Sequence, residues 1–187
     1  MNTQHQHDQL EPSAWVCRFA QLIAPGGAVL DLACGQGRHA RYLAGLGYRV
    51  EALDRDSAAL DSLAGVAGVA TRCIDLEASP WACAAASFDG IVVANYLHRP
   101  LVPALIQALR PGGVFIYETF AAGNEKLGRP SNPQFLLRPD ELLQWVRGHL
   151  QVLAFEQGLV GRPKHAVIQR ICAVQRAVEG CRLDLPG

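Results

Sequence analysis

The chain has 187 residues, half of them hydrophobic and 18% charged, a composition that supports a substantial buried core and predicts one domain over residues 1–187. Lysine and arginine together number 17, as do aspartate and glutamate, and this neutral balance disfavours a general nucleic-acid binder. The sequence has neither the run of roughly 20 apolar residues that a membrane-spanning helix needs nor a secretion signal, so we expect a cytoplasmic protein.

The N-terminal part of the chain predicts a short helix after a polar lead. Residues 1–12 are polar, and we expect them to be disordered. Ser13 can cap a helix over residues 13–24, whose apolar face includes Trp15 and Phe19. This helix is a candidate lid or oligomer surface, although the sequence predicts no oligomeric state.

The remaining chain alternates strands with helices. Apolar runs predict strands over 29–32, 48–53, 66–74, 88–97 and 114–119. Apolar residues at helical spacing predict helices over 38–46, 57–63, 101–109 and 140–147, the last with Pro139 at its first position. Two closing strands, 150–156 and 165–174, are too close in sequence for a crossover helix and predict an antiparallel hairpin. The predicted fold is an α/β, Rossmann-like three-layer sandwich with a mostly parallel seven-stranded sheet.

The stretch over residues 29–54 predicts a ligand site at the C-terminal edge of this sheet. Its sequence, VLDLACGQGRHARYLAGLGYRVEALD, predicts a strand, a glycine turn, a helix and a second strand that ends at Asp54. Gly35 and Gly37 allow positive φ and a close approach to the backbone, and the following helix directs free N–H groups into the same crevice. A carboxylate at the tip of the second strand is placed to accept the hydroxyls of a ribose. We therefore expect a nucleoside-containing ligand with a polar attachment.

Two cofactor classes fit that turn. The segment GQGRHA at 35–40 matches the dinucleotide pattern G-x-G-x-x-A, so a nicotinamide dehydrogenase is one interpretation. The predicted chain has no second domain for a substrate, and its last unit is a hairpin rather than a further parallel βαβ unit. Those two features favour the other class.

Five segments in order resemble the class I S-adenosylmethionine (SAM) dependent methyltransferases over residues 25–175. They are VLDLACGQGRHA, ALDRD at 52–56, CIDLE at 73–77, FDGIVVANYLHR at 88–99 and LRPGGVFIYETF at 109–120. The resemblance implies methyl transfer from SAM by in-line displacement, with S-adenosylhomocysteine as product. The YETF…GN…GRP…NP stretch is also similar to bacterial methyltransferases of the tellurite-resistance type, which implies a small acceptor.

Carried over by position, the resemblance implies a set of cofactor-binding residues. They are Asp31, Ala33, Gly35, Gly37, Asp54, Arg55, Asp75, Leu76 and Asn95. Asp31 and the turn would hold the methionine end, Asp54 the ribose hydroxyls and Asp75 the adenine amino group. Arg55 lies beside the ribose acid, and the Leu76 N–H would contact a ring nitrogen. Asp75 as a simple turn former stays open.

The acceptor side is expected beyond the fourth and fifth strands and in the loop over residues 120–139, whose length is typical of a functional loop. The catalytic candidates are His98 and Glu118, and the substrate-binding candidates are Tyr96, Arg99, Arg129 and Asn132. Two structural alternatives stay open: His98 as a helix cap, and Arg129 with Asn132 as braces of the loop. No triad is required, because a base is needed only for an acceptor that is protonated at neutral pH.

The sequence leaves the acceptor open. We expect a small polar molecule, and nucleic acid and membrane partners are disfavoured. One alternative is an RNA or protein methyltransferase, and another is a non-catalytic SAM-binding protein. Six scattered cysteines never form C-x-x-C, and we predict no metal site.

Overall fold

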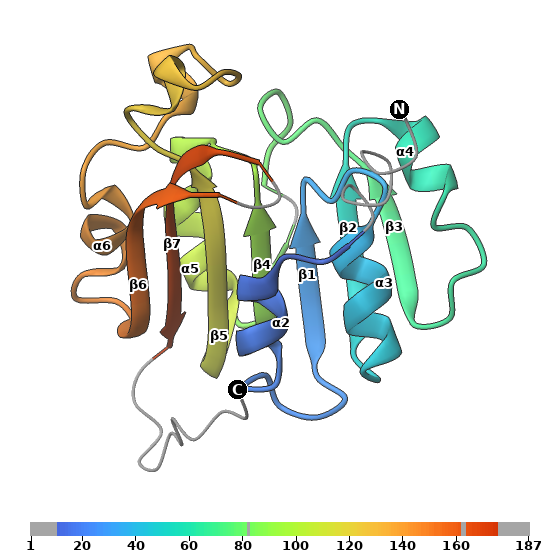
Figure 1. The fold of residues 1–187 in the computed structure, drawn as a ribbon. Helices are drawn as coiled ribbons and strands as arrows, with labels where there is room; N and C mark the ends of the chain where they lie inside the picture. The colour runs from blue at the N-terminus through green and yellow to red at the C-terminus, as the bar shows by residue number, and fades with distance from the viewer. Residues whose placement is uncertain (1–10, 82, 162–163, 176–187) are drawn as a thin grey trace.

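The computed structural model describes residues 11–81, 83–161 and 164–175, which form a sheet between two layers of helices (Figure 1). The prediction for residues 1–10 lies outside the described residues. The seven strands are β1 Ala28–Leu32, β2 Arg49–Asp54, β3 Val69–Cys73, β4 Phe88–Ala94, β5 Leu109–Phe120, β6 Gln151–Val160 and β7 Ala166–Val174.

The strands form one sheet in the order β3-β2-β1-β4-β5-β7-β6. All pairs from β3 to β5 are parallel, whereas β7 runs antiparallel to both β5 and β6. The predicted class is therefore confirmed, including the closing hairpin. Because the parallel strands point the same way, their carboxyl ends meet at one edge, the upper edge in Figure 1, and ligands of such sheets bind there.

Helices cover both faces of the sheet. The α-helices are α2 Ala14–Ala20, α3 Arg38–Gly45, α4 Ser57–Asp61, α5 Val102–Ala108 and α6 Glu141–Val146, and the 3-10 helices are η1 Arg99–Leu101, η2 Asn124–Lys126 and η3 Pro133–Phe135. Residues of α2, α3 and α4 share one buried cluster with one face of the sheet, and residues of α5 and α6 share another with the opposite face. The predicted sandwich of three layers follows from this division.

The predicted N-terminal helix is present over α2, and two side chains explain its position. The Ser13 hydroxyl accepts a hydrogen bond from the Trp15 N–H at 3.1 Å, the N-terminal cap that the sequence predicts. The Trp15 ring is 2% exposed, and its Nε1–H donates to the Ile171 carbonyl at 3.2 Å. Burial of an aromatic ring with its polar atom satisfied fixes this short helix to β7.

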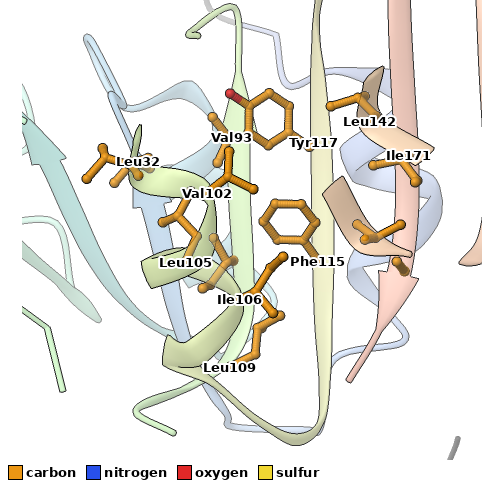
Figure 2. Close-up of a cluster of buried hydrophobic side chains, with 14 of the residues drawn as sticks. Leu32, Val93, Val102, Leu105, Ile106, Leu109, Phe115, Tyr117, Leu142 and Ile171 are labelled. Carbon is orange, nitrogen blue, oxygen red and sulfur yellow. The ribbon is translucent and has the colours of Figure 1, made fainter. Parts of the chain in front are cut away.

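The core on the α5/α6 face packs around two aromatic residues of β5. Figure 2 shows the rings of Phe115 and Tyr117 on β5, with side chains of α5 facing them. The two ring centroids lie 5.7 Å apart, and both rings are almost fully buried. The Tyr117 hydroxyl donates to the Tyr96 carbonyl at 2.8 Å, so this core also holds the chain just after β4.

Several element boundaries differ from the predictions. Helix α6 begins at Glu141, not near Pro139, because its N-cap Asp140 has φ +58°, which no helix continues through. Strand β3 begins at Val69, three residues late, directly after Gly68 at φ +80°. The two strands at the C-terminal side, β5 and β6, are longer than predicted: β5 starts at Leu109 and β6 continues to Val160.

Within the described residues, no helix is both long and apolar enough to cross a membrane. Among the helices of the described residues, the longest α-helix, α3, spans only eight residues. The predicted single-domain organisation over residues 1–187 stays a prediction.

The contact between β4 and the N-terminal helix layer predicts a stability effect. A Cβ at Gly90 would lie 2.5 Å from the Ile23 Cδ1 atom, and Ile23 is buried. We expect Gly90→Ala to lower the free energy of unfolding by about 1–3 kcal/mol through overpacking, measured by urea denaturation. Gly45→Ala, at an exposed site with open space around the new methyl group, is the control and should cause no loss. Equal stability of both variants would contradict the packing shown here.

Candidate functional site

The glycine turn after β1 contains three residues with positive φ at alternate positions. Ala33, Gly35 and Gly37 have φ of +52°, +54° and +76°, respectively. The Cys34 N–H donates to the Leu53 carbonyl at 3.0 Å, so the turn stays attached to the end of β2. Helix α3 then starts with Gly37 as its N-cap, and its first N–H groups face the carboxyl edge of the sheet.

Gly35 and Gly37 are suited to their positions for different structural reasons. A Cβ built on Gly37 would lie 2.4 Å from a methyl of Leu63, so a side chain there collides with the helix layer. A Cβ on Gly35 would meet no described heavy atom within 4 Å apart from its chain neighbours, so the space in front of Gly35 is open. Gly37 therefore serves close packing, and Gly35 leaves the backbone accessible to a ligand.

Asp54 lies at the tip of β2, as predicted, and its carboxylate ties the turn to that strand. Its Oδ2 accepts the Gly35 N–H at 2.7 Å, and its Oδ1 accepts the Asp56 N–H at 3.0 Å. A carboxylate offers about four lone-pair positions, so both oxygens keep capacity for the hydroxyls of a ligand. Arg55 follows directly and is exposed.

Asp31 is buried in the middle of the site with one oxygen unsatisfied. It is 1% exposed, and its Oδ2 has no hydrogen-bond partner among the described residues. Burial raises the pKa of Asp31 to about 7, against smaller lowering effects of the Ala40 N–H and the Arg38 charge. An orphaned buried oxygen is unfavourable unless a ligand supplies a donor, and an ammonium group fits that requirement.

The residues predicted for the adenine side follow β3, and Tyr96 follows β4. Asp75 Oδ1 accepts the N–H groups of Glu77 at 2.9 Å and Ala78 at 3.3 Å, so this carboxylate does form a turn. The Leu76 side chain is buried against the α5/α6 core. Tyr96 was predicted on the acceptor side; burial, with smaller effects of the Glu77 and Asp75 charges, raises the pKa of its hydroxyl to about 12. Its buried hydroxyl has no partner among the described residues.

A cavity of about 860 Å³ opens at the carboxyl edge, and Glu118 and Asn95 line it. Asn95 has φ +57°, and its N–H donates to the Glu118 carbonyl at 3.0 Å, which joins the ends of β4 and β5. Glu118 lies opposite Arg170 of β7 in the sheet register. The segment from Glu11 to Ala14 also borders this cavity. Glu118 is thus a predicted catalytic residue that faces a cavity.

Two predicted acceptor-side residues lie elsewhere. Arg99 forms a paired salt bridge with Glu141, at 2.7 Å and 3.0 Å, and donates to the carbonyls of Gln134 and Leu136. These contacts make Arg99 a brace between the β4 end and α6, and neither it nor His98 lines the cavity. His98 is the N-cap residue of η1 without a side-chain cap bond, so the cap alternative holds for its position only.

The loop over residues 120–139 is braced from inside by Asn124. Asn124 is buried, donates to the Pro130 carbonyl at 2.9 Å and accepts the Val167 N–H at 3.2 Å. Asn132 caps η3 by accepting the Gln134 N–H at 3.0 Å, which supports its bracing role. Arg129 is exposed on this loop.

Two of the cations around the cavity, Lys164 and Arg170, were not among the residues that the sequence predicted for the site. Arg38, Lys164 and Arg170 line it, together with the acids Glu11 and Glu118. Arg170 is ion-paired with Glu156 of β6, and its guanidinium lies 4.7 Å from the Trp15 ring centroid. Only the register of β7 against β5 brings Arg170 next to Glu118, and no local pattern in the sequence signals that register.

Comparisons with known proteins agree with this geometry. Residues 29–113 match the family described as "Methyltransferase domain". A curated relative, Hemagglutinin 1 of Eikenella corrodens, is 30% identical over 167 residues, which cover 82% of this chain and 53% of that protein. The chain therefore spans about half the length of the curated relative it matches.

Solved structures show the same fold. TehB of Haemophilus influenzae matches with a TM-score of 0.73 at 21% identity, covering 88% of this chain and 63% of that one. A TehB-like SAM-dependent methyltransferase of Corynebacterium glutamicum gives a TM-score of 0.61 at 21% identity, covering 84% and 86%. An S-adenosylmethionine dependent methyltransferase of Mesorhizobium loti gives 0.67 at 19% identity, covering 87% and 99%.

The buried Asp31 carboxyl predicts a pH dependence of stability. Its pKa is raised from 3.8 to about 7 on folding, so between these values the folded state binds more protons than the unfolded state. Stability therefore falls as pH rises through this window, by up to about 1.4 kcal/mol per pH unit. Asp31→Asn has no carboxyl group to titrate at this position. The stability of the variant relative to wild type, measured by urea denaturation, should therefore increase as the pH rises from 5 to 8. Parallel curves for the two proteins would contradict this assignment.

Proposed function

The chain has the class I fold of SAM-dependent methyltransferases, with a methyltransferase domain over residues 29–113, and we propose that it transfers a methyl group from SAM to a small polar acceptor. The observation that carries the proposal is the glycine turn, where Gly35 is open to a ligand between the carboxylates of Asp31 and Asp54. The cytoplasmic location expected from the sequence is part of the same proposal.

The chain's own groups fit the three parts of this cofactor. Asp31 Oδ2 would accept a hydrogen bond from the ammonium group of the methionine end, with the backbone from Ala33 to Gly37 beside that group. Asp54 would accept the ribose hydroxyls while it holds the Gly35 N–H. Asp75, with the Leu76 N–H, would bind the adenine, and the unpartnered Tyr96 hydroxyl adds a donor on that side.

SAM, when bound, supplies an electrophilic methyl on a sulfonium, and the chain has to orient the acceptor and exclude water. Asn95 and Glu118 lie where β4 and β5 end, at the border of the cavity. For an acceptor that carries a proton at neutral pH, the Glu118 carboxylate is the group placed to take it. For a thiolate or another soft anion, Glu118 would only position the acceptor.

The cavity supports a small and polar acceptor. Its volume of about 860 Å³ lies within the usual range of small-molecule sites, about 300–1,000 Å³. Two acids and three cations line it, and the exposed Arg129 lies on the neighbouring loop. An RNA or protein acceptor would instead call for a broad basic or apolar docking face, and the overall charge of the chain is zero.

The first experiment is a calorimetric titration of the purified protein with SAM, S-adenosylhomocysteine and NADH in parallel. Binding of the first two and not of NADH supports the cofactor assignment and justifies an acceptor screen with small anions and thiols. Binding of NADH alone would overturn the proposal. Binding of SAM without turnover of any acceptor would favour the non-catalytic alternative.

Asp54 provides the test of the ribose site. Asp54→Ala should weaken SAM binding by about 1.5–3 kcal/mol, because hydrogen bonds to a charged group are lost and the Gly35 N–H loses its acceptor. Calorimetry measures the change, with Asp61→Ala at an exposed position of α4 as the matched control. An unchanged dissociation constant in Asp54→Ala would remove this residue from the site.

Glu118 and Arg129 separate the cavity from the loop as the acceptor site. Glu118→Gln should lower kcat by about 10²- to 10⁴-fold if the acceptor loses a proton, with SAM affinity unchanged. Arg129→Ala should also leave SAM affinity intact and lower turnover less, since Arg129 is exposed. Loss of SAM binding in Arg129→Ala would assign the loop to the cofactor site instead.

A further inference from the structure

We infer that Arg38 and His39 are positioning residues that couple the cofactor turn to the wall of the acceptor cavity. They are the first two residues of α3, directly after the glycine turn. Both bind the segment over residues 11–13, which lies far from them in sequence and borders the cavity. The inference rests on the proposed function, because it assigns the turn to a cofactor and the cavity to an acceptor.

Two hydrogen bonds from neighbouring residues carry the coupling. The Ser13 N–H donates to His39 Nε2 at 3.2 Å, and Arg38 Nη1 donates to the Glu11 carbonyl at 3.2 Å. The His39 ring is 3% exposed and Ser13 is half-buried, so the bond between them is partly shielded from water. Breaking this bond would leave a polar atom of the buried His39 ring without a partner, which is unfavourable.

His39 lies between Asp31 on the cofactor side and the segment that borders the cavity. Its other ring nitrogen, Nδ1, lies 4.0 Å from Asp31 Oδ1, the carboxyl that would accept the cofactor's ammonium group. Burial, with a smaller effect of the Arg38 charge, lowers the pKa of His39 to about 3, so the ring is neutral at physiological pH. Because Nε2 accepts the Ser13 N–H, the single ring proton is on Nδ1 and faces Asp31.

The segment held by this pair leads into helix α2, which is anchored in the core. Trp15 anchors α2 to β7 from within the core, two residues after Ser13. Residues 11–14 continue from that anchor along the rim of the cavity, and Arg38 and His39 hold them from the cofactor side. We therefore expect a change in the charge or position of Asp31 to affect the cavity wall through the His39 ring.

Hydrogen exchange with S-adenosylhomocysteine as the probe tests the coupling. In wild type, saturating probe should slow exchange of the amides over residues 11–17 about fivefold or more, the lower end of typical coupling energies. His39→Leu, which has no acceptor for the Ser13 N–H, should lose this slowing while residues 33–37 stay protected by the probe. His39→Gln offers an amide oxygen near the Nε2 position and should restore it.

Ser13 gives a second set of variants that does not alter the histidine. Its φ of −58° suits proline, so Ser13→Pro removes the N–H with little backbone change, whereas Ser13→Ala removes only the hydroxyl cap. We expect Ser13→Pro to lose the probe-dependent slowing and Ser13→Ala to keep it. The double variant Ser13→Pro/His39→Leu should lose no more than either single variant, since both remove the same bond.

The outcomes separate this inference from the proposed function. Equal slowing in wild type and His39→Leu, or identical behaviour of His39→Leu and His39→Gln, would overturn the coupling while leaving the cofactor assignment intact. If wild type does not bind S-adenosylhomocysteine at all, both proposals fall. By linkage, the probe's affinity in His39→Leu should weaken by the same factor by which the slowing is lost.

Discussion

The hydrogen bond between the Asp54 carboxylate and the Gly35 N–H is the constraint on which the site depends. It joins the glycine turn after β1 to the tip of β2 at 2.7 Å, where the sheet's backbone ladder has ended and turn amides need other acceptors. With the turn held there, α3 begins at Arg38 and directs its first N–H groups over the same edge. Asp31, at the penultimate position of β1, is thereby enclosed under the helix.

Two braces complete the edge from opposite faces of the sheet. On the α5/α6 face, Arg99 binds Glu141 and two carbonyls before α6, which fixes the acceptor-side loop against the end of β4. On the other face, His39 accepts the Ser13 N–H and holds the segment before α2. The cavity lies between strands whose ends are far apart in sequence, and the segment held by His39 forms part of its wall.

The site keeps polar atoms that the fold itself does not need. Asp31 Oδ2 and the Tyr96 hydroxyl are buried without hydrogen-bond partners among the described residues. Each unsatisfied buried group is unfavourable by about 1–3 kcal/mol, so a fold selected for stability alone would pair or replace them. In the proposed function, a bound cofactor would provide partners for both atoms.

The sequence by itself determined the mostly parallel sheet with its closing hairpin, the glycine turn and the position of Asp54, because these follow from local patterns: apolar runs, φ-permissive residues and strand ends. It also placed Glu118 correctly at the end of β5. Only the tertiary structure decided the contacts of the Tyr96 and Arg99 side chains, since the direction of a side chain after a strand depends on residues that are distant in sequence. The same holds for His39, whose partner Ser13 is 26 positions away, and for Arg170, which meets Glu118 only through the register of β5 and β7. A short segment of sequence is enough to determine local backbone preferences, whereas the partner of a charged or aromatic side chain depends on tertiary packing.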